Sequence, residues 1–187
     1  MREELRKKVT MYQATNDIAL RGEIVVFGST FMANFPFYEL SQKYVMPNAV
    51  YNRSVEGLTL EEAEAHLDEC VLDIKPSKIF LSLGETDLEN PSALTVYNRI
   101  LFRIKTKLPE AKIYVLSVPK DDAAQNDEER LAFNEKLKDL ADRANVRFLG
   151  LEVHEFGKRF YEKIFKELHC FFRSNRLSFA DAFSCGD

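Results

Sequence analysis

The chain has 187 residues, and 45% of them are hydrophobic, which is enough for one buried core and too little for two ordinary domains. We therefore expect a single domain spanning residues 1–187. Its 26 Lys and Arg residues against 30 Asp and Glu residues give a formal net charge of -4, and no basic stripe could follow a phosphate backbone. A nucleic-acid partner is therefore not expected.

The sequence also lacks the marks of export and of a disulfide framework. A basic N-terminal stretch is not followed by the apolar segment of a signal peptide, and no apolar run is long enough to cross a membrane. We therefore expect a cytoplasmic protein with no membrane span. Cys70, Cys170 and Cys185 form an odd set without CxxC spacing, which predicts reduced thiols and no zinc site.

The predicted elements alternate between helices and short apolar strands. Residues 1–20 favour an extra helix at the N-terminus. Five nearly continuous apolar runs follow, and such runs are typical of strands that are buried on both faces. They are "EIVVFG" (23–28), "NAVYN" (48–52), "KIFLSLG" (78–84), "KIYVLSV" (112–118) and "VRFLGL" (146–151).

Helical patterns fill the intervals between these strands. Residues 59–74 begin with Thr59 and Glu62 at the spacing of a capping box, and residues 92–108, 126–144 and 155–172 repeat apolar side chains at helical spacing. A strand-to-strand interval of about thirty residues is that of a βαβ unit. The sequence therefore predicts an α/β fold, with a parallel sheet of five strands and helices on both faces.

Polar and glycine residues follow the predicted strands where each one ends. In an open α/β sheet, ligands bind outside the carboxyl ends of the strands. The residues that leave those ends include 28–30, 52–57 and 84–87. We therefore expect these three loops to meet at one cleft.

Three of these segments, taken in order, resemble the sequence blocks of the SGNH, or GDSL-type, hydrolases. "VVFGSTF" resembles the first block, which ends in Gly-Asp-Ser, and "VYNRSVEGLT" resembles the Asn-x-Gly-x-x-Gly turn of the second. "IFLSLGETDL" resembles the third block, Gly-x-Asn-Asp. The resemblance implies a three-layer α/β/α sandwich with a flavodoxin-like sheet, and hydrolysis of acyl esters without a cofactor or a metal.

The resemblance also assigns roles to individual residues. Ser29 and Thr30 replace the Asp-Ser pair, so Thr30 holds the nucleophile position, while Gly57 and Thr86 hold the oxyanion-hole positions. A threonine hydroxyl can attack a carbonyl, although its methyl group crowds the approach. Candidate ligand-binding residues are Asn52, Glu56, Asp87 and Arg176.

The base that would take the nucleophile's proton has two candidate positions. The tail contains no Asp-x-x-His block. One alignment places Arg176 at the histidine position and Arg173 at the aspartate position, and arginine cannot act as a base because it stays protonated. The other alignment supplies His169 as the base, with Lys166 where an orienting carboxylate is needed.

Each candidate also has a structural interpretation. Ser29 and Thr30 can cap a helix, Gly57 can supply a tight turn, and Thr86 with Asp87 can bond neighbouring backbone.

The sequence is compatible with three functions. The first is a hydrolase-like protein with an eroded site, weak or no hydrolysis, and a small-molecule ester or acyl ligand or a partner bound at the remaining pocket. The others are an active esterase that uses Thr30, and a non-catalytic assembly subunit.

Overall fold

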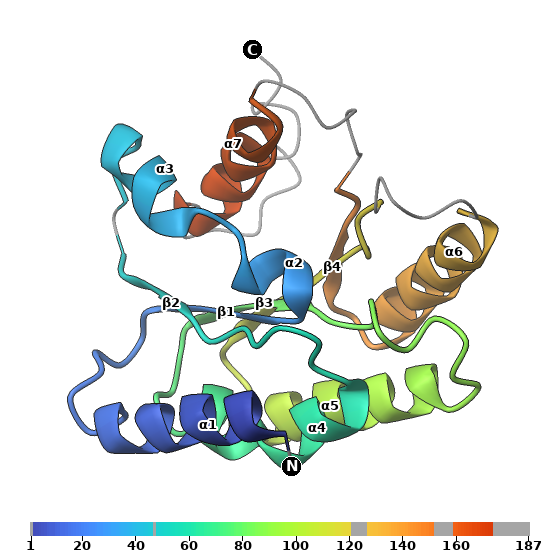
Figure 1. Cartoon of the computed structure of the whole chain (residues 1–187), viewed down its shortest axis with the longest axis horizontal. Coiled ribbons are helices and arrows are strands. Elements are labelled where there is room, and N and C mark those ends of the chain that lie inside the picture. The colour runs from blue at the N-terminus through green and yellow to red at the C-terminus, as the bar shows by residue number, and fades with distance from the viewer. Residues whose placement is uncertain (1, 47, 121–126, 152–158, 174–187) are drawn as a thin grey trace.

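A computed structural model of the chain describes residues 2–46, 48–120, 127–151 and 159–173. Its centre is a five-stranded sheet in which all neighbouring strands are parallel (Figure 1). The spatial order is β2-β1-β3-β4-β5. The strands are β1 (Ile24–Gly28), β2 (Val50–Asn52), β3 (Lys78–Ser82), β4 (Lys112–Leu116) and β5 (Arg147–Leu149). The predicted parallel α/β fold is confirmed.

Helices cover both faces of this sheet (Figure 1). Helices α1 (Glu3–Thr15), α4 (Leu60–Ala65) and α5 (Ala93–Lys107) lie on one side, and α2 (Thr30–Ala33), α3 (Phe37–Lys43) and α7 (Phe160–Arg173) lie on the other. Helix α6 (Glu128–Arg143) contributes its buried side chains to the same core as α5. The three layers are therefore helices, sheet and helices.

Alternate residues of each strand face two separate cores. Val25 and Phe27 of β1 pack with α1, α4 and α5, whereas Ile24 and Val26 pack with α2, α3 and α7. Because successive side chains of a strand point to opposite faces, a strand covered on both faces must be apolar at every position. The buried run of five residues in β1 follows from this geometry.

Two local predictions can be compared with the described residues. The capping box at Thr59 and Glu62 is present, but the helix that it begins stops at Ala65, and a π-helical turn (Asp68–Leu72) follows. The expectation of reduced thiols is wrong for Cys170, which is disulfide-bonded, whereas Cys70 is free and buried. No helix within the described ranges has the length and apolar character needed to cross a bilayer.

Helix α7 runs along the strands, from their carboxyl ends toward their amino ends. Near its start, the rings of Phe160 and Tyr161 lie 6.3 and 6.4 Å from the ring of Phe31 in α2. Near its end, Lys78 at the first position of β3 donates hydrogen bonds from Nζ to the carbonyls of Phe171 (3.0 Å) and Phe172 (2.6 Å). The N-terminal turn of α7 therefore lies at the carboxyl edge of the sheet, and its C-terminal turn lies at the amino edge.

Candidate functional site

The first three strands are joined directly where they end. The Ser29 N–H donates to the Ser82 carbonyl (2.9 Å), and the Val55 N–H donates to the Gly28 carbonyl (3.0 Å). Gly28 permits this closeness, because a Cβ there would lie 2.7 Å from the Ser82 carbonyl oxygen. The exits of β1, β2 and β3 thus form one continuous surface at the carboxyl edge of the sheet.

Thr30 and Gly57 meet at this edge. Gly57 donates its backbone N–H to Thr30 Oγ1 at 2.9 Å, which joins the first and second resembling blocks across 27 residues of sequence. Gly57 has a φ of +65°, in the left-handed region that glycine adopts without strain. Thr30 N–H has no hydrogen-bond acceptor among the described residues. The nucleophile position therefore has two backbone donors beside it.

Ser29, the other hydroxyl residue of the first block, is fully buried. It occupies the N-cap of α2, but its side chain makes no capping hydrogen bond. Within the described part of the chain its Oγ has no hydrogen-bond partner. Neither Ser29 nor Thr30 therefore acts as a helix cap, and it is Thr30 that contacts the second block.

Thr86 and Asp87 are bonded to the loop that leads into α4. Thr86 Oγ1 donates to the Leu58 carbonyl at 3.0 Å and lies 2.9 Å from Asp87 Oδ2, which accepts the Leu60 N–H at 3.1 Å. Burial raises the pKa of the Asp87 carboxyl, while these donors act against that rise. The structural interpretation of both residues is confirmed, because the side chains tie the loop after β3 to the loop after β2.

Glu85, between Gly84 and Thr86, points toward the nucleophile position. Its carboxylate oxygens accept the Phe31 N–H at 3.1 and 3.2 Å, and Phe31 directly follows Thr30 in the chain. Glu85 lies in the 84–87 segment after the third predicted strand, and the resemblance assigns it no role. The signal that could have singled it out is its place inside the third block.

His169 lies on the part of α7 that leads away from this edge. Its Nε2 is 3.0 Å from the Val45 carbonyl, and its ring packs against Tyr44 and Phe165. It is nine residues after Phe160, which corresponds to about 13 Å along a helix that rises ~1.5 Å per residue. His169 thus contacts the segment directly after α3 and its own helix, and none of these contacts reaches Thr30.

The remaining candidates differ in how they are placed. The Asn52 side chain joins the backbone of α2 to that of the loop after β2. Its Nδ2 donates to the Met32 carbonyl (2.8 Å), and its Oδ1 accepts the Ser54 N–H (3.1 Å). Glu56 is exposed, and its carbonyl accepts a hydrogen bond from Arg2. Arg176 lies outside the described residues.

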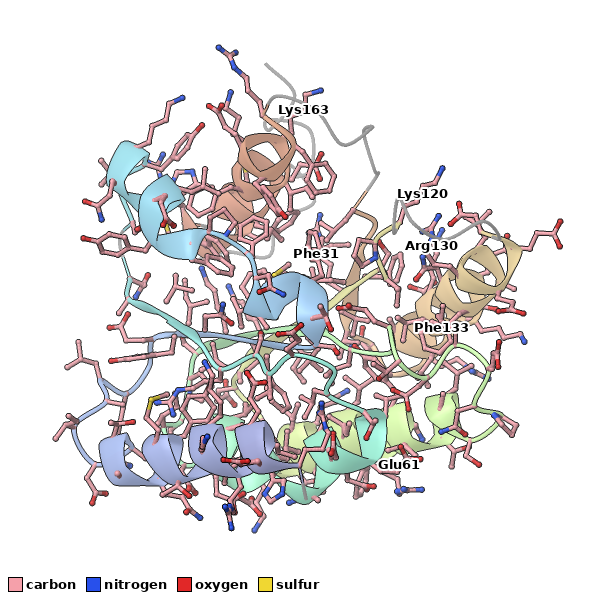
Figure 2. All side chains as sticks on the ribbon, viewed as in Figure 1. Phe31, Glu61, Lys120, Arg130, Phe133 and Lys163 are labelled. Atoms are coloured by element: carbon pink, nitrogen blue, oxygen red, sulfur yellow. The ribbon has the colours of Figure 1, made fainter. Side chains whose placement is uncertain are left out.

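An aromatic group covers one side of the edge. The ring of Phe31 contacts Phe35 at 5.8 Å in addition to Phe160 and Tyr161. Figure 2 shows Phe31 on α2, facing the space between α7 and α6, with Lys120, Arg130 and Phe133 on the opposite side. Thr30 is therefore followed directly by an aromatic side chain that packs within a group of four rings.

Several solved structures are similar in fold to this chain. The chain is similar to a Streptococcus pneumonia protein provisionally described as a platelet activating factor, with a TM-score of 0.80 at 20% identity over 91% of this chain and 93% of that one. A GDSL-like lipase from Bacteroides thetaiotaomicron VPI-5482 gives a TM-score of 0.60 at 13% identity, over 76% and 77% of the two chains.

A psychrotrophic esterase from Pseudoalteromonas sp., in a form inhibited by monoethylphosphonate, gives 0.59 at 15% identity over 71% and 80%. No protein-family model and no curated protein matches the sequence significantly. The shared sheet and helices show that this chain has the fold of the GDSL-like lipases and esterases, the SGNH hydrolase fold.

Proposed function

We propose that the protein is a slow hydrolase of carboxylic esters, with Thr30 as its nucleophile and a partly eroded active site. One observation carries this proposal: the hydrogen bond from Gly57 N–H to Thr30 Oγ1. It places a hydroxyl and a backbone donor together at the carboxyl edge of the sheet, and acyl transfer needs both.

In the first half of the reaction, Thr30 Oγ1 forms a bond to the ester carbonyl carbon while the hydroxyl proton passes to a base. The carbonyl oxygen becomes an oxyanion, which the backbone N–H groups of Thr30 and Gly57 stabilise. In the free protein the Gly57 N–H is bonded to Oγ1, and it is released as Oγ1 shares its electron pair with carbon. The tetrahedral intermediate then expels the alcohol, and water later hydrolyses the acyl-threonine.

Three features make this reaction slow. The Thr30 methyl group stiffens the side chain and crowds the attack. The Thr86 hydroxyl donates to Leu58 and not toward Thr30, so one side-chain donor of the oxyanion hole is missing. The absence of one such donor costs about 3 kcal/mol in the transition state, which corresponds to a rate lower by about 100-fold or more. His169, held at the Val45 carbonyl, is not in contact with Thr30.

The substrate class follows from the walls of the site. Phe31 adjoins the nucleophile position and packs with Phe35, Phe160 and Tyr161. Such an aromatic group favours an apolar acyl chain on that side. We therefore expect esters with apolar acyl groups, and no cofactor or metal takes part in the proposed reaction.

The test is hydrolysis of a short-chain nitrophenyl ester by the wild type and by Thr30→Ala and Thr30→Ser. The Ala variant should fall to the buffer rate, and the Ser variant should exceed the wild type because the crowding methyl group is gone. His169→Ala should retain activity.

A covalent probe gives a second readout that does not depend on turnover. A reactive ethylphosphonate should add one phosphonyl group to the wild type, detected by intact mass and mapped to Thr30, and should leave Thr30→Ala unmodified. Hydrolysis equal in wild type and Thr30→Ala, together with no adduct, would overturn the proposal. That result would leave binding of an acyl ligand without turnover, the reading favoured by the Thr86 bond to Leu58.

A further inference from the structure

The side chain of Arg2 joins the start of α1 to the loop that carries Gly57. Its Nη1 donates a hydrogen bond to the Glu56 carbonyl at 3.0 Å. Its Nε and Nη2 donate to the two carboxylate oxygens of Glu62, at 3.2 and 2.8 Å, and Glu62 is the residue that completes the capping box of α4. The guanidinium therefore binds one carboxylate at two points and a backbone carbonyl at a third.

The carbonyl that Arg2 binds belongs to the same peptide unit as the Gly57 N–H. The Glu56–Gly57 peptide bond is trans, so its C=O and its N–H point in opposite directions. Arg2 bonds the carbonyl end, and Thr30 Oγ1 accepts the N–H at the other end at 2.9 Å. One planar unit is thus held between a guanidinium and the nucleophile position.

Arg2 is itself held at both ends. Its backbone leads directly into α1, whose inner side chains are buried in the core beside α4 and α5 (Figure 1). Its guanidinium lies so close to Gly57 that a Cβ there would be 2.8 Å from Nη1. Glu62 is fixed in turn, since its side chain accepts the Thr59 N–H and its own N–H donates to Thr59 Oγ1. The peptide unit is therefore set in place before a substrate arrives.

We propose that Arg2 is a positioning residue of the proposed active site, which aligns and polarises the Glu56–Gly57 peptide so that the Gly57 N–H stabilises the oxyanion. This inference rests on the ester hydrolysis proposed above. A cation bonded to the carbonyl draws electron density from the amide and makes its N–H a stronger donor. Because negative charge develops beside this N–H only as the tetrahedral intermediate forms, the effect is larger in the transition state than in the free protein.

The ion pair with Glu62 keeps this effect local. The hydrogen bonds between the two side chains raise the pKa of Arg2 and lower the pKa of the Glu62 carboxyl, so both groups are charged at neutral pH. Glu62 balances the guanidinium, and Arg2 therefore acts through its contact with the peptide. The Arg2 side chain is 45% exposed, so water screens the ion pair, which contributes little to stability. Removal of Arg2 should therefore change the rate more than the fold.

The experiment compares kcat/KM for a short-chain nitrophenyl ester in the wild type, Arg2→Ala and Arg2→Lys. Loss of a complete oxyanion donor costs about 100-fold or more, and a donor that stays in place but is less well aligned should cost less. We expect Arg2→Ala to lose about 10-fold. Arg2→Lys should recover part of the loss, because it keeps a cationic donor. The rate at which a reactive ethylphosphonate labels Thr30 should fall in Arg2→Ala by the same factor as kcat/KM.

Arg99→Ala is the matched control. Arg99 of α5 forms the same two-point ion pair with Glu64 of α4, with both contacts at 2.7 Å, and its side chain is 51% exposed. Among the described residues its hydrogen bonds go to Glu64 alone. The kcat/KM of this variant should equal that of the wild type. Both alanine variants should lower the melting temperature by the same small amount, at most about 4 °C.

The outcomes separate this inference from the function on which it rests. Thr30-dependent hydrolysis and labelling at the wild-type rates in Arg2→Ala would overturn the role of Arg2 and leave the esterase intact. An equal loss of kcat/KM in Arg2→Ala and Arg99→Ala would overturn that role as well, because the loss would then come from a weakened α4. Hydrolysis that does not depend on Thr30 would overturn both proposals.

Discussion

Thr86→Val is the substitution that best separates a structural role of the Thr86 hydroxyl from a catalytic one. Valine keeps the branched shape of threonine but removes the hydroxyl that donates to the Leu58 carbonyl and lies 2.9 Å from Asp87 Oδ2. In the third block of the family this position supplies an oxyanion donor. In this structure the hydroxyl instead holds two loops together, so we expect the variant to lose stability and keep its activity.

The magnitude follows from the two acceptors. The hydroxyl has one proton, so one net hydrogen bond of about 1 kcal/mol is lost, and an acceptor that is left partly buried without its donor adds about 1 kcal/mol or more. A loss of about 2 kcal/mol in a domain of this size lowers the melting temperature by about 4–8 °C. The Thr86 hydroxyl acts to lower the pKa of the Asp87 carboxyl, so in the variant this pKa should rise further above its ordinary value.

Two measurements on the same preparation decide the matter. Thermal unfolding followed by circular dichroism should give the lower melting temperature, and kcat/KM for the nitrophenyl ester at 20 °C should stay within twofold of the wild type. Thr86→Ser, which keeps the hydroxyl, is the control and should retain most of the stability. A kcat/KM that falls about 100-fold at an unchanged melting temperature would refute the reasoning, because the hydroxyl would then act on the oxyanion.

Two further predictions concern the sheet itself. Burial, with a smaller effect of Lys112, lowers the pKa of Lys78 from 10.5 to about 8, so the folded chain binds this proton more weakly than the unfolded chain. The free energy of unfolding should therefore rise between pH 8 and 10 by more in the wild type than in Lys78→Met, as measured by urea unfolding, and equal slopes would contradict this. Gly28→Ala forces a Cβ to within 2.7 Å of the Ser82 carbonyl oxygen and should lower the free energy of unfolding by about 2 kcal/mol, whereas Gly150→Ala, which meets only ordinary contact at 3.9 Å, should be neutral. Equal free energies of unfolding for the two alanine variants would contradict this, because they would show that the ends of β1 and β3 can move apart at no cost.

The architecture was predictable because it depends on patterns that span many residues. A strand covered on both faces has to be apolar throughout, and "KIFLSLG" reads that way and forms β3. Once parallel strands are inferred, their carboxyl ends must lie at one edge, so the meeting of Thr30 with Gly57 follows from topology.

What could not be predicted depends on single rotamers and local packing. Sequence spacing does not say that the Thr86 hydroxyl turns to Leu58, or that Glu85 reaches the amide of Phe31. The stop of α4 at Ala65 interrupts a pattern that is periodic as far as Ile74. His169 lies in an amphipathic helix, and only the direction of α7 across the sheet reveals which edge it approaches.

The contact between Gly57 N–H and Thr30 Oγ1 has a consequence for inhibitors. The carbonyl oxygen of a planar ester must compete with Thr30 Oγ1 for the hydrogen bond of the Gly57 amide. A boronate that has bonded to Oγ1 is already tetrahedral, and the Gly57 amide is then free to donate to a boronate oxygen. In the proposed reaction, the resting site therefore discriminates against the planar shape of an ester and in favour of the tetrahedral shape through which the reaction passes. Acyl boronic acids should bind far more tightly than ketones of the same carbon skeleton.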